Sequence, residues 1–178
     1  MGISRANEPV DIEKIAVKNR RGAKQSPVHA AVARHHLREL IVAINDGEDI
    51  EAWDDDGRTP LFLAAFNGHK AVLAELLRNG AQVNARDADE KTPLHYAAQE
   101  YQLDVIELLV RGGALVDAQD KDGNTPLSEA VYYSRGRGAM ITLLLKMGAK
   151  RTLKNRHGVS PVELANTISN YRVDGFFK

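Results

Sequence analysis

The chain has 178 residues, of which 43% are hydrophobic, and its 24 Lys and Arg residues balance its 24 Asp and Glu residues. A chain of this length suits one domain, whose folding can bury roughly 70% of the surface of the unfolded chain. The zero net charge argues against a dedicated nucleic-acid binder, and the lack of cysteine excludes disulfide bonds and thiolate metal sites.

The N-terminal part of the chain differs from the rest. Residues 1–24 lack the repeating pattern that fills residues 25–178, so we expect an N-terminal arm followed by one repeat domain. Within the arm, residues 10–19 (VDIEKIAVKN) are predicted to form one or two helical turns over the first repeat, and a basic connector follows.

Two markers repeat along the domain with the same period. Five Ser-Pro or Thr-Pro pairs, spaced 33, 33, 33 and 35 residues apart, begin at Ser26, Thr59, Thr92, Thr125 and Ser160. Four glycines, spaced 33, 33 and 35 residues apart, are Gly47, Gly80, Gly113 and Gly148. Because both markers slip by two residues at the same place, residues 134–138 (SRGRG) are predicted to contain a two-residue loop insertion. A fixed period of this size is typical of a stacked repeat protein.

Each unit predicts a pair of helices and a turn. In the second unit, Thr59 is suited to cap a short helix over residues 60–68, and proline fits its first position because no N–H is needed there. A second helix over residues 70–80 carries an apolar stripe formed by Val72, Leu73, Leu76 and Leu77. Gly80 ends this helix, and residues 81–91 form a projecting turn or hairpin. One such pair cannot bury its own apolar face, so the units must stack.

Residues 54–85, 87–118 and 120–150 resemble the ankyrin-repeat family, as in DDDGRTPLFLAAFNGHKAVLAELLRNGAQVNA. Residues 26–52 and 155–178 resemble N- and C-terminal capping repeats. The resemblance implies an all-α solenoid of three full repeats plus two capping repeats. The third unit departs from the family pattern in its loops: Glu90 replaces the hairpin glycine, and Tyr101-Gln102 replaces the Gly-His pair seen at Gly68-His69.

Catalytic and metal sites are not predicted. The resemblance implies that His29 and His95 hydrogen-bond the hydroxyl three residues before each of them. The adjacent His35 and His36 point about 100° apart on a helix and lack an acidic partner at ligand spacing. No G-x-S-x-G motif or P-loop is present, so we expect no enzyme activity and no cofactor.

Charge is distributed unevenly along the chain. Seven acidic residues and no basic residue lie between Asp46 and Asp56, whereas seven basic residues and no acidic residue lie between Arg135 and Arg156. Such runs are either solvated surface or a means of steering an oppositely charged partner.

The concave face, formed by the hairpin tips and the ends of the first helices, is the predicted binding surface. Trp53 occupies a position that is polar in the other units, so its ring is expected to be exposed, and Phe66 and the tyrosines are expected to continue an aromatic stripe. The predicted contact residues are Trp53, Asp55, Asp56, Arg58, Phe66, Asn67, Lys91, Gln99, Tyr101, Lys121, Tyr132 and Tyr133.

Two functions fit a non-catalytic protein-binding module. The first is a bacterial immunity or antitoxin protein that neutralises a toxin, for which the acidic run suits a basic toxin such as a nuclease. The second is a regulatory or scaffold subunit that docks a cellular protein. With no apolar stretch long enough to span a membrane and no apolar segment typical of a secretory signal, we expect a cytoplasmic protein, monomeric when free, without direct contact to nucleic acid or membrane.

Overall fold

The computed structural model describes residues 26–168 and 172–177. The described residues contain nine α-helices, one short 3-10 helix and no β-strand. The helices, in chain order, are α2 (Pro27–Ala33), α3 (Leu37–Asn45), α4 (Pro60–Asn67), α5 (Lys70–Arg78), α6 (Pro93–Gln99), α7 (Leu103–Arg111), α8 (Pro126–Tyr132), α9 (Ala139–Lys146), α10 (Pro161–Thr167) and η1 (Asp174–Phe177).

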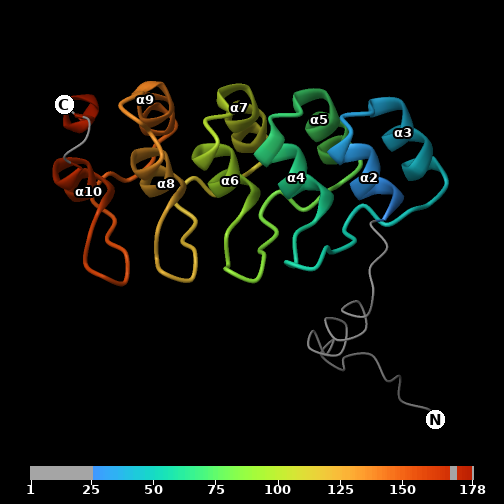
Figure 1. Ribbon diagram of the computed structural model, residues 1–178, viewed down its shortest axis with the longest axis horizontal. Helices are drawn as coiled ribbons and strands as arrows, with labels where there is room; N and C mark the ends of the chain where they lie inside the picture. Colours follow the sequence, from blue (N-terminus) through green and yellow to red (C-terminus); the bar gives the residue numbers. More distant parts are fainter. Residues whose placement is uncertain (1–25, 169–171, 178) are drawn as a thin grey trace, which may run out of the picture.

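The helix pairs stack side by side into an elongated all-α solenoid (Figure 1). The first helices α2, α4, α6, α8 and α10 form one row, and the second helices α3, α5, α7 and α9 form the other. In the last unit η1 takes the place of a second helix and packs on both α9 and α10. The predicted arrangement of three full repeats between two capping repeats is therefore confirmed. The predicted helical turns over residues 10–19 lie outside the described residues.

The second helices bury one apolar stripe each. In α5 the side chains of Val72, Leu73 and Leu76 are fully buried, as the sequence predicts. Leu77 is only partly buried, because it lies at the edge of the stripe, where its Cδ1 atom faces Gly112 of the next unit. Gly80 follows the helix with φ of +87°, a left-handed conformation that glycine adopts without a steric penalty.

The hairpins are held by one side chain per unit. Asp87 illustrates the pattern: its Oδ1 accepts hydrogen bonds from the backbone N–H groups of Asp89 and Lys91, both at 2.9 Å. Glu90 adopts φ of +59° at the position that glycine fills in the neighbouring hairpins, and the backbone hydrogen bond from Asp87 to Lys91 still forms at 3.1 Å. The third hairpin therefore keeps the repeat geometry despite its unusual sequence.

The N-terminal caps of the first helices show one defect. In four units the capping hydroxyl hydrogen-bonds the side chain three residues later, as Thr92 Oγ1 does with His95 Nδ1 at 2.9 Å. The second unit has Phe62 at this third position, which offers no polar atom, and Thr59 Oγ1 is buried without a hydrogen-bond partner among the described residues. The four satisfied pairs are Ser26–His29, Thr92–His95, Thr125–Ser128 and Ser160–Glu163.

This difference predicts opposite outcomes for one substitution at two equivalent positions. Thr59→Val removes an unsatisfied buried hydroxyl, so the free energy of unfolding should stay unchanged or rise by up to about 1 kcal/mol. Thr92→Val removes a hydroxyl that is paired with buried His95, so the free energy of unfolding should fall by about 1–2 kcal/mol. Urea denaturation of both variants measures the difference, and equal losses would contradict it.

Candidate protein-binding face

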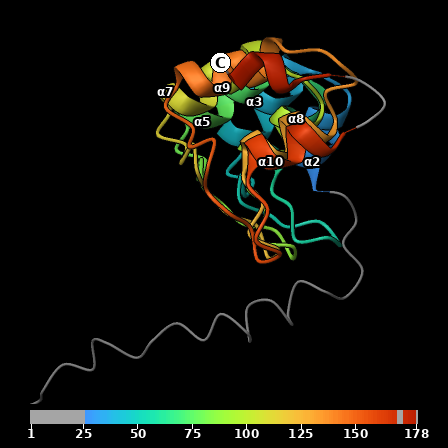
Figure 2. The same ribbon diagram turned by 90° about the vertical axis from the view of Figure 1, so that its left-hand side faces the viewer.

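The hairpins project at an angle from the helical layers, which leaves an inner corner between them and the first helices (Figure 2). We call the surfaces that meet in this corner the concave face. Two of the pockets on the hairpin side of the described residues are lined by predicted contact residues, one toward each end of the stack. They bring together two separate groups of the predicted contact residues.

The pocket at the N-terminal end, here called the Trp53 pocket, has a volume of about 350 Å³. The Trp53 side chain is 36% exposed, as the sequence predicts. Because Asp54 organises the hairpin through its backbone hydrogen bonds, its neighbours Asp55 and Asp56 are presented at the tip. The pocket is lined by Ser26, His29, Trp53, Asp54, Asp55, Asp56 and Arg58.

Arg58 neutralises part of the acidic run. Its guanidinium lies 2.9 Å from Asp54 Oδ2 and 2.6 Å from Asp56 Oδ2. Burial lowers the pKa of Arg58, but the hydrogen bond and charge of Asp54 offset this effect, so the pKa is raised and the group stays charged. Asp55 is exposed and makes no ion pair with a described residue, so it is the carboxylate in this pocket most available to a partner.

An aromatic cluster occupies the middle of the concave face. Phe66 is 40% exposed, and its ring centroid lies 6.1 Å from that of Tyr96 in an edge-to-face arrangement. Tyr96 also contacts Phe62 at 5.8 Å and donates its hydroxyl to Asp87 Oδ2 at 2.7 Å. Burial, followed by the hydrogen bond to Asp87, raises the pKa of Tyr96, so the hydroxyl keeps its proton. Phe66 is thus supported by a fixed neighbour.

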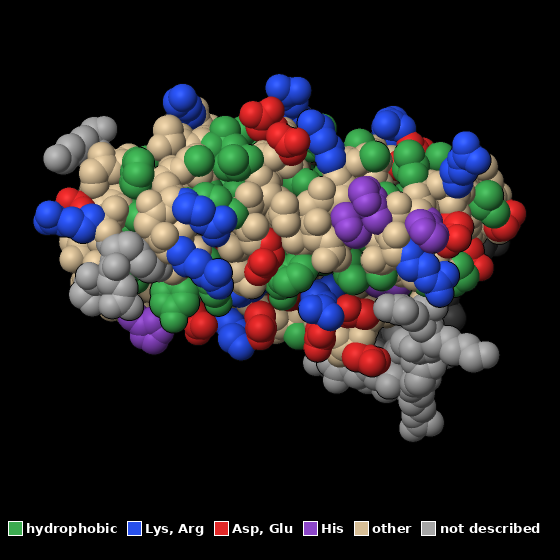
Figure 3. All heavy atoms as spheres, turned by 45° about the horizontal axis from the view of Figure 1, so that its top comes forward, with side chains coloured by type: hydrophobic (Ala, Val, Ile, Leu, Met, Phe, Trp, Pro, Cys, Tyr) green, Lys and Arg blue, Asp and Glu red, His purple; other side chains and the backbone are tan. Residues whose placement is uncertain are grey.

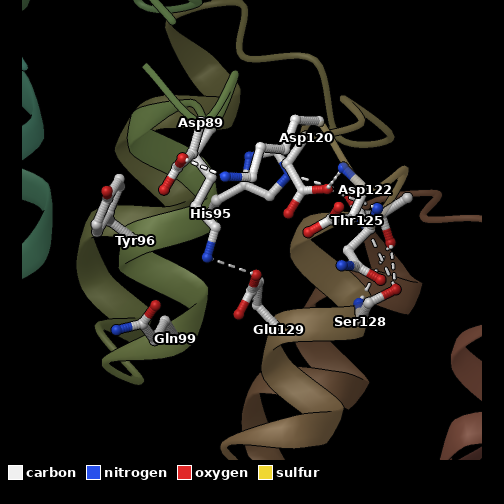
Figure 4. Close-up of polar contacts among 12 residues, drawn as sticks. Asp89, His95, Tyr96, Gln99, Asp120, Asp122, Thr125, Ser128 and Glu129 are labelled. Atoms are coloured by element: carbon white, nitrogen blue, oxygen red, sulfur yellow. Dashed lines mark hydrogen bonds and ion pairs between the residues drawn. The ribbon is translucent and has the colours of Figure 1, made fainter. Parts of the chain in front are cut away.

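The pocket at the C-terminal end, here called the Glu129 pocket, has a volume of about 290 Å³. At its inner side Lys91 Nζ lies 2.8 Å from Glu129 Oε1, and Figure 4 shows Glu129 reaching from α8 toward α6. The pocket is lined by Lys91, Asn124, Ser128, Glu129, Tyr132, Tyr133, Asn155, Val159, Ser160 and Leu164.

The Lys91–Glu129 pair is largely withdrawn from solvent, with side chains 20% and 9% exposed. Burial raises the pKa of Glu129, and the nearby ammonium of Lys91 compensates only in part. Burial lowers the pKa of Lys91, but the hydrogen bond and charge of Glu129 more than offset this, so the ammonium stays protonated. The two charges of the pair therefore balance each other.

The remaining predicted residues are less available. Tyr101 is partly buried, with the guanidinium of Arg137 4.1 Å from its ring centroid, so an exposed ring is not found there. Lys121 pairs with Asp89 of the neighbouring hairpin at 2.6 Å. Asn67 donates to the Leu63 carbonyl, and Gln99 donates to Glu100.

Glu129 and Tyr96 lie on the candidate face, but the sequence prediction did not include them. They occupy equivalent positions in successive first helices, which Leu63 fills in the second unit and Leu164 in the last. A charged residue at a position that is apolar in other units was the signal that could have identified Glu129.

The face formed by the second helices carries acidic and basic side chains close together (Figure 3). At the basic end, Lys150 lies 3.9 Å from Asp117 and Lys154 lies 3.7 Å from Glu163. Pairing thus reduces the lengthwise charge separation that the sequence suggests. Within the described residues, no group of His, Asp and Glu side chains could hold a metal ion, and no helix is long and apolar enough to cross a membrane.

Compared with known protein families, the chain matches the family described as Ankyrin repeats (3 copies) over residues 6–87 and 76–155. The chain belongs to the ankyrin-repeat family. No curated protein matches it. Ankyrin repeats are protein–protein interaction modules that are generally non-catalytic, so this ankyrin protein is a protein-binding module.

Proposed function

We propose that this ankyrin protein is a stoichiometric inhibitor of the immunity or antitoxin type, which binds and neutralises a basic toxin such as a nuclease. The observation that carries the proposal is the Trp53 pocket, which is lined both by a partly exposed indole and by the carboxylate of Asp55, a group with no ion pair to any described residue. An aromatic anchor next to a carboxylate suits a cationic side chain of a partner, through cation–π contact and charge.

The surrounding charge supports the same kind of partner. Three further acidic residues precede Trp53 in the chain, and none of them forms an ion pair with a described residue. They are Asp46, Glu48 and Asp49. An acidic region of this kind attracts a basic protein and raises its association rate at low salt. Within the same proposal we place the protein in the cytoplasm, monomeric when free.

The proposal is tested by co-expressing this protein with the product of a neighbouring toxin gene. Neutralisation predicts that cells survive and that the two proteins form a 1:1 complex in solution. Continued toxicity, or a complex that leaves the toxin fully active, would exclude the inhibitor role. A complex with a non-toxic cellular protein would favour a regulatory or scaffold subunit instead.

The Trp53 pocket predicts which substitutions weaken that complex. Trp53→Ala should raise the Kd by roughly 30-fold, because it removes an anchor worth about 2 kcal/mol. Asp55→Asn should slow association at low salt and have less effect at high salt, because its contribution is long-range attraction. Surface plasmon resonance across a salt series measures both effects.

Leu115→Ala provides the control. Leu115 is another exposed apolar side chain, and it lines neither pocket. This variant should bind like the wild type, and all three variants should unfold at the wild-type temperature. If Trp53→Ala and Asp55→Asn left both Kd and association rate unchanged, the interface would lie elsewhere on the protein.

A further inference from the structure

The Glu129 pocket has unfilled hydrogen-bonding capacity beside its ion pair. Glu129 accepts from Lys91 through Oε1, and among the described residues its other carboxylate oxygen has no hydrogen bond. The Lys91 ammonium has three N–H groups, and among the described residues its ion pair is with that carboxylate alone. The pocket therefore presents an acceptor and a donor next to each other.

The pocket walls are partly aromatic and aliphatic. Tyr132 and Tyr133 meet edge to face with their ring centroids 4.9 Å apart, and the Tyr132 side chain is 60% exposed. Val159 and Leu164 line the pocket from the last unit. Its volume of about 290 Å³ lies just below the range of roughly 300–1,000 Å³ that is usual for sites of drug-sized ligands. The space therefore suits one large side chain of a partner protein.

We propose that the Glu129 pocket binds a tyrosine side chain of the partner protein. A phenol hydroxyl both donates and accepts, so it bonds the free oxygen of Glu129 and Lys91 Nζ at the same time. Its ring packs between the Tyr132–Tyr133 pair and Leu164, an arrangement that aromatic pairs favour. This inference rests on the proposed role in protein binding and names the chemistry of a second anchor.

Other side chains fit this pocket less well. An arginine would bring its charge next to the Lys91 ammonium, and an aspartate would bring its charge next to the Glu129 carboxylate. A phenylalanine would cover both groups and leave their remaining hydrogen bonds unmade, which is costly for charged groups removed from water. Tyrosine avoids these costs, because its side chain is neutral, aromatic and large enough to fill the space, and its hydroxyl can bond both members of the pair.

The preference is measurable with small probes on the full chain. N-acetyl-tyrosinamide, N-acetyl-phenylalaninamide and N-acetyl-argininamide are titrated into the ¹⁵N-labelled protein, and amide shifts are followed by NMR. The tyrosine probe should shift the amides of α8 and α10 and bind roughly tenfold more tightly than the phenylalanine probe. Equal binding of these two probes, stronger binding of the arginine probe, or no binding of any probe would overturn the proposal.

A double variant separates the ion pair from the shape of the pocket. In Lys91→Met/Glu129→Met both charges are replaced by apolar side chains, an exchange that buried pairs usually tolerate. This variant should lose the preference for tyrosine over phenylalanine. If the folded double variant still preferred the tyrosine probe to the phenylalanine probe, the ion pair would not be the group that recognises the hydroxyl.

The matched control is Lys70→Met/Asp104→Met, which removes another Lys–carboxylate pair, between α5 and α7 and outside the pocket. It should keep the wild-type preference. The probe titrations do not involve a toxin, so they can fail while toxin neutralisation succeeds. Loss of neutralisation with an intact tyrosine preference would instead overturn only the proposed inhibitor role.

Discussion

Leu144→Ala is expected to lower the free energy of unfolding by about 2–5 kcal/mol. Leu144 lies in α9 with its side chain fully buried in the continuous core between the two rows of helices. Truncation removes buried apolar surface and leaves a cavity, because stacked neighbours cannot collapse freely into the space. Urea denaturation followed by circular dichroism measures the loss.

Leu77→Ala is the matched control, since the same atoms are removed at a partly buried site. Its loss should be clearly smaller than that of Leu144→Ala. Because the stack is held by nearest-neighbour contacts, the Leu144 variant should also lose protection from amide hydrogen exchange in the units adjacent to α9 before it does so in more distant units. Equal losses for the two variants would contradict the assigned burial of α9.

The fold could be predicted from the sequence because each unit repeats the same signals for the start and the end of its helices. The Thr-Pro pairs mark the starts of the first helices, and Gly80 with its equivalents marks the ends of the second helices. The third hairpin was less predictable, because Glu90 is an unfavourable residue for a left-handed conformation. Its geometry is imposed by the hydrogen bonds of Asp87 and by the neighbouring hairpins. The conformational preference of Glu90 alone does not include these contacts.

The candidate site was predicted in part. Exposure of Trp53 and Phe66 followed from comparing equivalent positions, and the structure confirms that both rings reach solvent. Comparison within one unit could not show that Arg58 pairs with Asp54 and Asp56, or that Lys91 reaches Glu129 in the next repeat. The Arg58 pairs depend on how its own hairpin folds, whereas the Lys91–Glu129 contact depends on the distance between side chains of adjacent units, which becomes known only once the units are stacked.

Acidification should destabilise the protein through His95, by up to about 3 kcal/mol between pH 6.5 and pH 4. His95 is fully buried, and burial is the main reason that its pKa falls from 6.5 to about 4. Its Nε2 faces the Asn124 carbonyl at 3.1 Å, and its Nδ1 accepts from the Thr92 N–H at 3.0 Å. A proton added to Nδ1 would face that N–H donor, so the folded state disfavours the charged ring.

The sign of the effect follows from proton binding. Between pH 6.5 and pH 4 the unfolded chain binds a proton at His95 that the folded chain does not, so the stability present above pH 6.5 is lost as the pH falls through this window. His95→Gln isolates the effect, because glutamine at this position can still accept from the Thr92 N–H without titrating. The difference in unfolding free energy between wild type and His95→Gln should therefore shift by about 3 kcal/mol in favour of the variant from pH 7 to pH 4. If urea denaturation showed a constant difference over this range, His95 would take up its proton equally in the folded and unfolded chains. That result would contradict a neutral His95 ring whose two nitrogens hydrogen-bond the Thr92 N–H and the Asn124 carbonyl.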